Sequence, residues 1–206
     1  FGLKVTEKIT IWKYPKFSRY GKDAGKDNEA FLDAKLFQDL FLSPLDDVKD
    51  RIGPVMLEFS QFFPGTIASG SEFVERLDKF FSEVLKYSKI QFAIEMRNKS
   101  WLQAPYFKML EKHGVAHVFN SWTRMPLLKE QLEAAKPFKL PCVVSRILLQ
   151  PGTAYEEAVE AFSPYDKIVE EYPELRAGGA ALIDYAIEAG IPAYVFVNNR
   201  AEGCAP

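Results

Sequence analysis

The sequence contains few of the residues that form disulfides in small domains or bind metals. Among its 206 residues are two cysteines, Cys142 and Cys204, and two histidines, His113 and His117. Two cysteines are too few for a disulfide framework and are typical of a reducing compartment, so we expect a cytoplasmic protein. The histidines and cysteines are dispersed and do not have the ligand spacing of a zinc site. We therefore expect no cofactor.

A long apolar run and a strong net charge are also missing. No stretch approaches the roughly 20 apolar residues of a membrane-spanning helix, so we expect no membrane contact. Lysine and arginine number 26 and aspartate and glutamate 28, a net charge of −2 that does not indicate a basic surface for nucleic acid. Residues 12–26, "WKYPKFSRYGKDAGK", are a local exception that mixes basic and aromatic side chains. No feature of the sequence indicates an oligomeric state.

What the sequence does contain is an alternation of two patterns. Short β-rich runs occur at residues 2–6, 54–59, 90–96, 115–120, 141–147 and 192–198. Helical patterns separate several of them, at residues 71–87, 102–114 and 181–190. Strands that alternate with helices predict a parallel sheet, here in one α/β domain over residues 1–206. Neither G-x-G-x-x-G nor a P-loop follows any strand, which argues against a nucleotide-binding Rossmann fold. Six units suit either an open doubly wound sheet or an incomplete barrel.

Charged residues stand near the ends of several predicted strands, opposite large apolar residues. In "FAIEMR" the large apolar side chains alternate with Glu95 and Arg97. Lys4, Glu58 and Arg146 occupy similar positions in other strands. In a parallel barrel the carboxyl ends of the strands form the functional face, so we expect these five side chains to converge there.

The five charges have chemically distinct candidate roles. Glu95 is the first candidate for a general acid or base and Glu58 the second, because burial and a neighbouring cation shift a carboxyl pKa in opposite directions. Lys4, Arg97 and Arg146 are candidates to hold an anion. The alternative is a network of salt bridges that only fills the interior. A magnesium ion held between the two carboxylates is a weaker alternative.

Further polar and aromatic residues are candidate ligand contacts. Trp101 is a candidate wall of the pocket, or else a plain core residue. Asn198 and Asn199 end the last strand, where they are candidate hydrogen-bonding groups or ordinary turn residues. Asn120 ends the fourth strand and is a candidate for the same reason. Tyr155 follows a turn-like Pro-Gly pair and is a candidate lid residue.

Several of these motifs together resemble one family. "AIEMRNKSW" resembles the Glu-Phe-Arg-x-x-Ser-Trp signature of the DUF72 (YecE-like) family, and "YVFVNNRAEGCAP" resembles its late strand that ends in Asn-Asn. "KVTEKIT" and "IGPVMLEFSQFFP" are similar to two other family stretches. The resemblance covers nearly the whole chain. It implies a TIM-type (β/α)8 parallel barrel that lacks about two N-terminal βα units here and is truncated at both ends. Its motif positions are Lys4, Glu95, Arg97, Trp101, Asn198 and Asn199.

Two departures from the family pattern affect the chemistry. Glu58 stands where many members have glutamine, which adds an inward negative charge. The strand at 141–147 continues as "SRILLQPGTAY" and not as Arg-x-His-Gly, so Arg146 is present but the histidine is not. A mechanism that needs this histidine as a base is therefore in doubt for this chain.

Three functions are compatible with these residues. The first is an enzyme, a hydrolase or lyase with a glutamate acid/base, acting on a small anionic metabolite that is phosphorylated or carboxylated. Three inward cations against two carboxylates motivate this interpretation. The second is a non-catalytic protein that binds or senses such a ligand. The third, nucleic-acid processing, rests only on residues 12–26.

Overall fold

The computed structural model describes residues 1–63, 65–150, 152 and 155–205. The strands are β1 (Leu3–Lys4), β2 (Val55–Glu58), β3 (Phe92–Glu95), β4 (Ala116–Asn120), β5 (Val143–Ile147) and β6 (Ala193–Val197). The α-helices are α1 (Glu7–Thr10), α2 (Ala34–Phe37), α3 (Gly70–Val84), α4 (Ala104–His113), α5 (Leu128–Ala135), α6 (Tyr155–Phe162) and α7 (Pro173–Ala189). Short 3-10 or π segments are η1 (Ser18–Asp23), η2 (Gln38–Leu42), η3 (Ser43–Arg51) and η4 (Lys99–Trp101).

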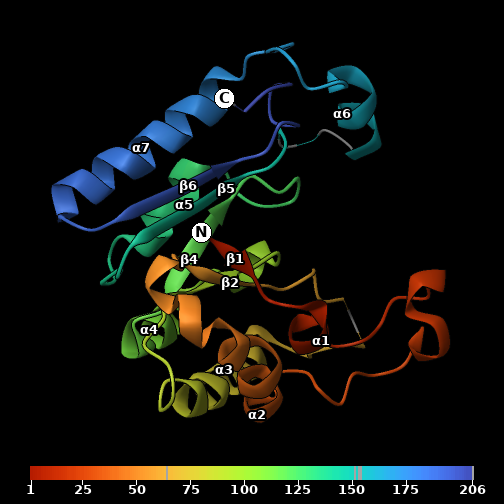
Figure 1. The fold of residues 1–206 in the computed structure, drawn as a ribbon. Helices are drawn as coiled ribbons and strands as arrows, with labels where there is room; N and C mark the ends of the chain where they lie inside the picture. Colours follow the sequence, from red (N-terminus) through yellow and green to blue (C-terminus); the bar gives the residue numbers. More distant parts are fainter. Residues whose placement is uncertain (64, 151, 153–154, 206) are drawn as a thin grey trace.

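All six strands belong to one parallel sheet whose order follows the chain, from β1 to β6. The sheet is curled, and α2, α3 and α4 cover the outer face of its first half while α5 and α7 cover the second half (Figure 1). This arrangement is a half-barrel with alternating helices. The prediction of a parallel α/β sheet is therefore confirmed.

The prediction of a TIM-type (β/α)8 parallel barrel that lacks about two N-terminal βα units is wrong, because the six described strands form a curled half-barrel and not a closed barrel of eight units. The sheet has six strands, and among the described residues no ladder of hydrogen bonds joins β1 to β6. A TIM-type barrel closes with eight tilted strands, and the six strands described here do not close. Side chains from β6 lie across the open side instead. A Cβ atom on Gly2 would stand 2.3 Å from the Phe196 ring, so only glycine permits this approach.

The two faces of the sheet have separate apolar cores. The outer core contains Phe92, Ile94 and Met96, which pack under the helices as the alternation predicts. The inner core is small and consists of Met56, Ala93, Ala116, Val118, Cys142 and Val144, with Tyr194 and Phe196 packed against it. Because the inner face carries small residues, it leaves room for the charged side chains at the strand ends.

The helices follow the predicted periodicity with some differences. α3 begins after Ser69, whose hydroxyl accepts a hydrogen bond from Glu72 N, and it buries five apolar side chains. α4 ends at His113 and is capped by Gly114, which has a φ of 60°. α5 and the first half of α7 were not predicted. Among the described residues, no helix is both long and apolar enough to span a membrane.

Candidate functional site

The register of the sheet gathers the charged strand ends at one edge, with a stagger of two residues between some strands. Glu58 pairs with Glu95 between β2 and β3, and Asn120 pairs with Arg146 between β4 and β5. Lys4 ends β1 opposite Met56, two residues before Glu58. Since the strands are parallel, all these residues lie at the carboxyl edge of the sheet and on its inner face. We call Lys4, Glu58, Glu95, Arg97 and Arg146 the charge cluster.

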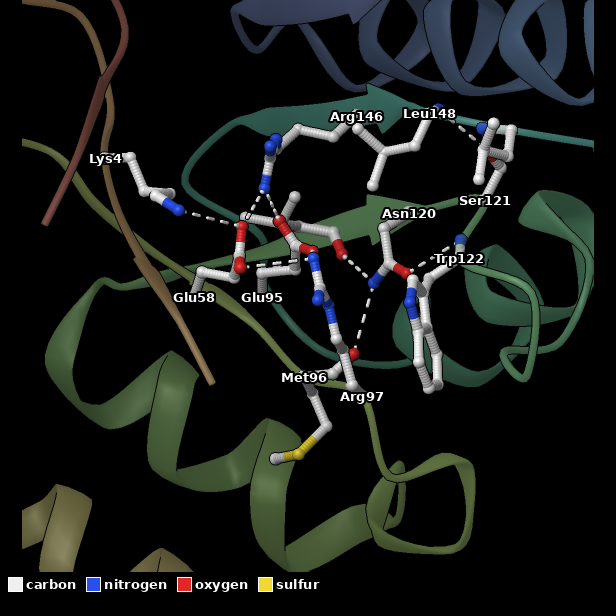
Figure 2. A network of polar contacts seen from close by, with 12 residues as sticks. Lys4, Glu58, Glu95, Met96, Arg97, Asn120, Ser121, Trp122, Arg146 and Leu148 are labelled. Atoms are coloured by element: carbon white, nitrogen blue, oxygen red, sulfur yellow. Dashed lines mark hydrogen bonds and ion pairs between the residues drawn. The ribbon is translucent and has the colours of Figure 1, made fainter. Parts of the chain in front are cut away.

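Direct ion pairs connect all five members of the charge cluster (Figure 2). Arg97 donates from Nε and Nη2 to Glu95 Oε1, at 3.1 and 2.9 Å, and its Nη2 lies 3.2 Å from Glu58 Oε1. Arg146 donates from Nη1 to Glu58 Oε2 at 2.6 Å and to Glu95 Oε2. Lys4 Nζ lies 3.6 Å from Glu58 Oε2. Each carboxylate therefore bridges the two guanidinium groups.

The members of the cluster differ in their access to solvent. The Glu95 side chain is fully buried. The side chains of Glu58, Arg97 and Arg146 are 16%, 17% and 20% exposed to solvent. The Lys4 side chain is 46% exposed. Glu58, not Glu95, is thus the carboxylate that a ligand from solvent would meet.

The environment favours the charged forms of Glu58 and Arg146. Burial acts to raise the pKa of Glu58, but Arg97, Arg146 and Lys4 outweigh this effect and lower it. Burial acts to lower the pKa of Arg146, but Glu95 and Glu58 outweigh this effect and raise it. By formal charge the cluster has three cations and two carboxylates.

Trp122 and Asn120 complete the wall of the site beside Arg97 (Figure 2). The Arg97 guanidinium lies 5.4 Å from the centre of the Trp122 ring, a cation–π contact. The Asn120 amide donates to the carbonyl oxygens of Met96 and Val118 and accepts from Trp122 N. Asn120 therefore fixes the end of β4 and the position of Trp122, and its amide is already engaged.

Gln131, on α5, stabilises the end of β4 through hydrogen bonds. Its amide donates to the carbonyl oxygens of Asn120 and Pro126, and its Oε1 accepts from Asn120 N. Gln131 and Trp122 were missed by sequence reasoning. For Trp122 a signal existed, because this aromatic residue follows the predicted strand at 115–120 by two positions.

The other predicted contacts lie outside the charge cluster. Trp101, in η4, stacks on Phe62 with ring centres 5.3 Å apart and packs beside α3. Asn198 Oδ1 accepts from Arg200 N, and Asn199 Oδ1 accepts from Ala205 N. These asparagines organise the turn after β6.

Two further predictions concern Tyr155 and metal binding. Tyr155 begins α6, but its side chain lies outside the described residues, so its lid role stays a prediction. Within the described part of the chain, no group of three or more His, Cys, Asp or Glu side chains is placed to hold a metal ion. Figure 2 shows that the carboxylates of Glu58 and Glu95 are engaged by guanidinium groups.

Comparison with known proteins supports the resemblance found in the motifs. A family model described as "Protein of unknown function DUF72" matches residues 1–206. A crystal structure of a DUF72 family protein from Thermotoga maritima is similar over 98% of this chain and 68% of that chain, with 17% identity and a TM-score of 0.57. No curated protein matches the chain.

Proposed function

This chain belongs to the DUF72 family, and from that premise and the site geometry we propose an enzyme that acts on a small anionic metabolite at the charge cluster. The substrate class is a phosphorylated or carboxylated compound. One observation carries the proposal. Three cations and two carboxylates from β1, β2, the end of β3 and β5 converge at the carboxyl edge of a parallel sheet, where they have a formal excess of one positive charge and partial access to solvent.

The cations would bind the anion, with Lys4 as the first contact. Its ammonium is the most exposed charge of the cluster. Arg97 and Arg146 contact the carboxylates through part of each guanidinium, which leaves Arg97 Nη1 and Arg146 Nη2 without a hydrogen bond to the described residues. These donors suit a phosphate or carboxylate oxygen, because a guanidinium fork matches both.

Glu58 is the better placed acid/base group. It reaches solvent, whereas Glu95 is buried between the two arginines and holds them in position. Glu58 is ionised at neutral pH, as a general base must be, but its lowered pKa makes it a weaker proton acceptor than an ordinary carboxylate. Either a hydrolase or a lyase can use such a base.

Thermal stability in different salts tests the anion site. We expect phosphate to raise the melting temperature more than chloride does at equal ionic strength, because the anion relieves repulsion among three cations. A ligand at about 100 times its Kd adds roughly 2.7 kcal/mol of stability. If phosphate, sulfate and small carboxylates all behave as chloride does, the anion site is refuted.

Two arginine variants provide a matched comparison for that experiment. Arg97→Lys keeps the charge but loses the planar fork, so we expect it to lose most of the phosphate-dependent increment. Arg176→Lys makes the same change at α7, where the arginine pairs with Glu202 outside the cluster. It should leave the increment unchanged.

A non-catalytic binding protein is the second candidate, because guanidinium groups hold both carboxylates in the structure. Glu58→Gln separates the two functions once a metabolite that shifts the melting temperature has been found. An enzyme would lose turnover of this metabolite and retain binding. A binding protein would show no turnover in either form.

A further inference from the structure

A cleft outside the charge cluster lies between two loops at the same edge of the sheet. One loop, residues 12–28, folds back on itself as a flap, with hydrogen bonds between Tyr14 and Lys26 and between Asn28 N and Trp12 O. The other loop follows β2. The cleft between them has a volume of about 360 Å³, and its lining includes Trp12, Tyr14, Lys16, Gln61, Phe62 and Phe63. The flap includes η1 and projects from the body of the molecule beside α1 (Figure 1).

The charge of the flap is opposite to that of the whole chain. Residues 12–28 contain five cations and two acidic residues, a net charge of +3, whereas the chain carries −2. Three of the cations have acidic partners at 3.2 to 3.9 Å, namely Lys13, Arg19 and Lys26. Lys16 and Lys22 form no ion pair with the described residues. A cationic flap over a cleft on an acidic protein is complementary to a polyanion.

One exposed aromatic side chain lines the cleft and another lies on the flap, next in the chain to the lining residue Lys16. Phe63, in the cleft, is 55% exposed, and Phe17, on the flap, is 60% exposed. Phe62 forms the wall behind Phe63 and is fixed by stacking on Trp101. Exposed phenylalanine rings are costly in water, and beside unpaired lysines they match ligands that have both a flat ring and a negative charge.

We propose that the flap and the cleft bind single-stranded nucleic acid, independently of the small-anion site. Bases would stack on Phe63 and Phe17, and Lys16 and Lys22 would pair with backbone phosphates. A strand fits better than a duplex, because the bases of a duplex are stacked on one another and do not present their faces. A chain of contacts connects the cleft to the charge cluster through Arg124 and Trp122. Arg124 donates to Gln61 at 2.9 Å and lies over the Trp122 ring, on which Arg97 also rests.

Fluorescence anisotropy with a labelled oligothymidylate of about 12 nucleotides tests the proposal on the full chain. We expect binding that weakens as salt rises, because phosphates pair with lysines and release counterions. Phe63→Ala should weaken binding about ten-fold, as expected when a stacking ring is removed. Phe63 is half exposed, so this variant should fold as the wild type does, which circular dichroism checks.

Charge-matched variants separate the flap from the rest of the surface. Lys16→Ala/Lys22→Ala should reduce the salt dependence of log K by about 1.4, the value for two lost phosphate contacts on a single strand. Lys79→Ala/Lys108→Ala removes the same charge from exposed positions on α3 and α4 and should have no such effect. If both double variants reduced the salt dependence of log K equally, the proposal would be overturned. So would equally tight binding of a duplex, equal competition by thymidine monophosphate, or no binding at low salt.

Discussion

His117 shows how a buried polar residue can be accommodated behind the site. It lies on β4 and points toward the helices, where its Nδ1 is 3.1 Å from the Tyr106 hydroxyl and its Nε2 is 3.3 Å from Gln131 Oε1. Gln131 in turn holds both backbone groups of Asn120. One consistent arrangement has neutral His117 donating from Nε2 and accepting from Tyr106. Each polar atom is then satisfied without a charge in the core.

Stability should depend on pH through this residue. Burial lowers the pKa of His117 to about 4, below the ordinary value of about 6.5. The unfolded chain therefore binds a proton between these values that the folded chain does not bind. We expect the free energy of unfolding to fall by about 3 kcal/mol as the pH drops from 7 to 4. Denaturant titrations across this range measure the effect.

Other groups contribute to the same acid transition, so a variant is needed as reference. The pKa values of Glu58 and Asp78 are lowered by basic neighbours, which also makes stability fall in acid. In His117→Gln these carboxylates remain, but the contribution of His117 to the pH dependence of stability is lost. The loss of stability between pH 7 and 4 should become smaller than in the wild type. Identical losses in both proteins would contradict the assignment to His117.

At the residue scale, the alternation of apolar and charged residues predicted which side chains form the charge cluster. It did not predict which of the two carboxylates reaches solvent. The period of two placed Glu95, Arg97 and Arg146 on the inner face, where the structure has them. It could not show that Glu95 is sealed between two arginines while Glu58 reaches solvent. That difference depends on side chains from four strands, which no local pattern contains.

At the scale of elements, the start of α3 offers a direct test of a local signal. Ser69 caps the helix, and Glu72 Oε2 accepts from Ala68 N in return. We expect Ser69→Ala to lower the free energy of unfolding by about 1 kcal/mol. Ser71→Ala, in the first turn but not at the cap, should change it by less than about 0.5 kcal/mol. Chemical denaturation of the two variants compares them.

The helix that sequence reasoning only half predicted is α7. Its second half has a clear apolar pattern, but Gly178 and Gly179 in its first half lower helix propensity. The structure explains these glycines by close packing. A Cβ atom on Gly178 would stand 3.0 Å from Leu128 of α5, and one on Gly179 would stand 3.2 Å from Ile147 of β5. These tertiary contacts thus outweigh the low helix propensity of the two glycines. The local sequence does not reveal them.

At the scale of the whole molecule, the alternation of strands and helices predicted the parallel sheet, but it left the strand order open between a doubly wound sheet and a barrel. It did not determine closure, because strand number and tilt decide whether a curled sheet meets itself. The six strands leave an open side, and Tyr194 and Phe196 pack there against the inner core. The open half-barrel therefore depends on aromatic side chains where a closed barrel would have backbone hydrogen bonds.

The open side of the sheet also has a consequence for colloidal behaviour. β6 pairs with β5 along one side, and among the described residues no strand pairs with its other side. Its sequence, "AYVFV", has aromatic and β-branched residues and neither charge nor proline, which is the composition of segments that assemble into cross-β aggregates. Heating that loosens the neighbouring loops should expose this edge to other molecules.

A lysine at this edge of β6 should oppose such assembly. Val197 is 45% exposed at the end of β6, and Val48, on η3, is 44% exposed away from the sheet. We expect Val197→Lys to slow the growth of light scattering at elevated temperature, because a charge at the edge opposes strand addition. Val48→Lys adds the same charge elsewhere and should leave the rate unchanged. Equal protection by both variants would assign the effect to net charge and not to the edge of β6.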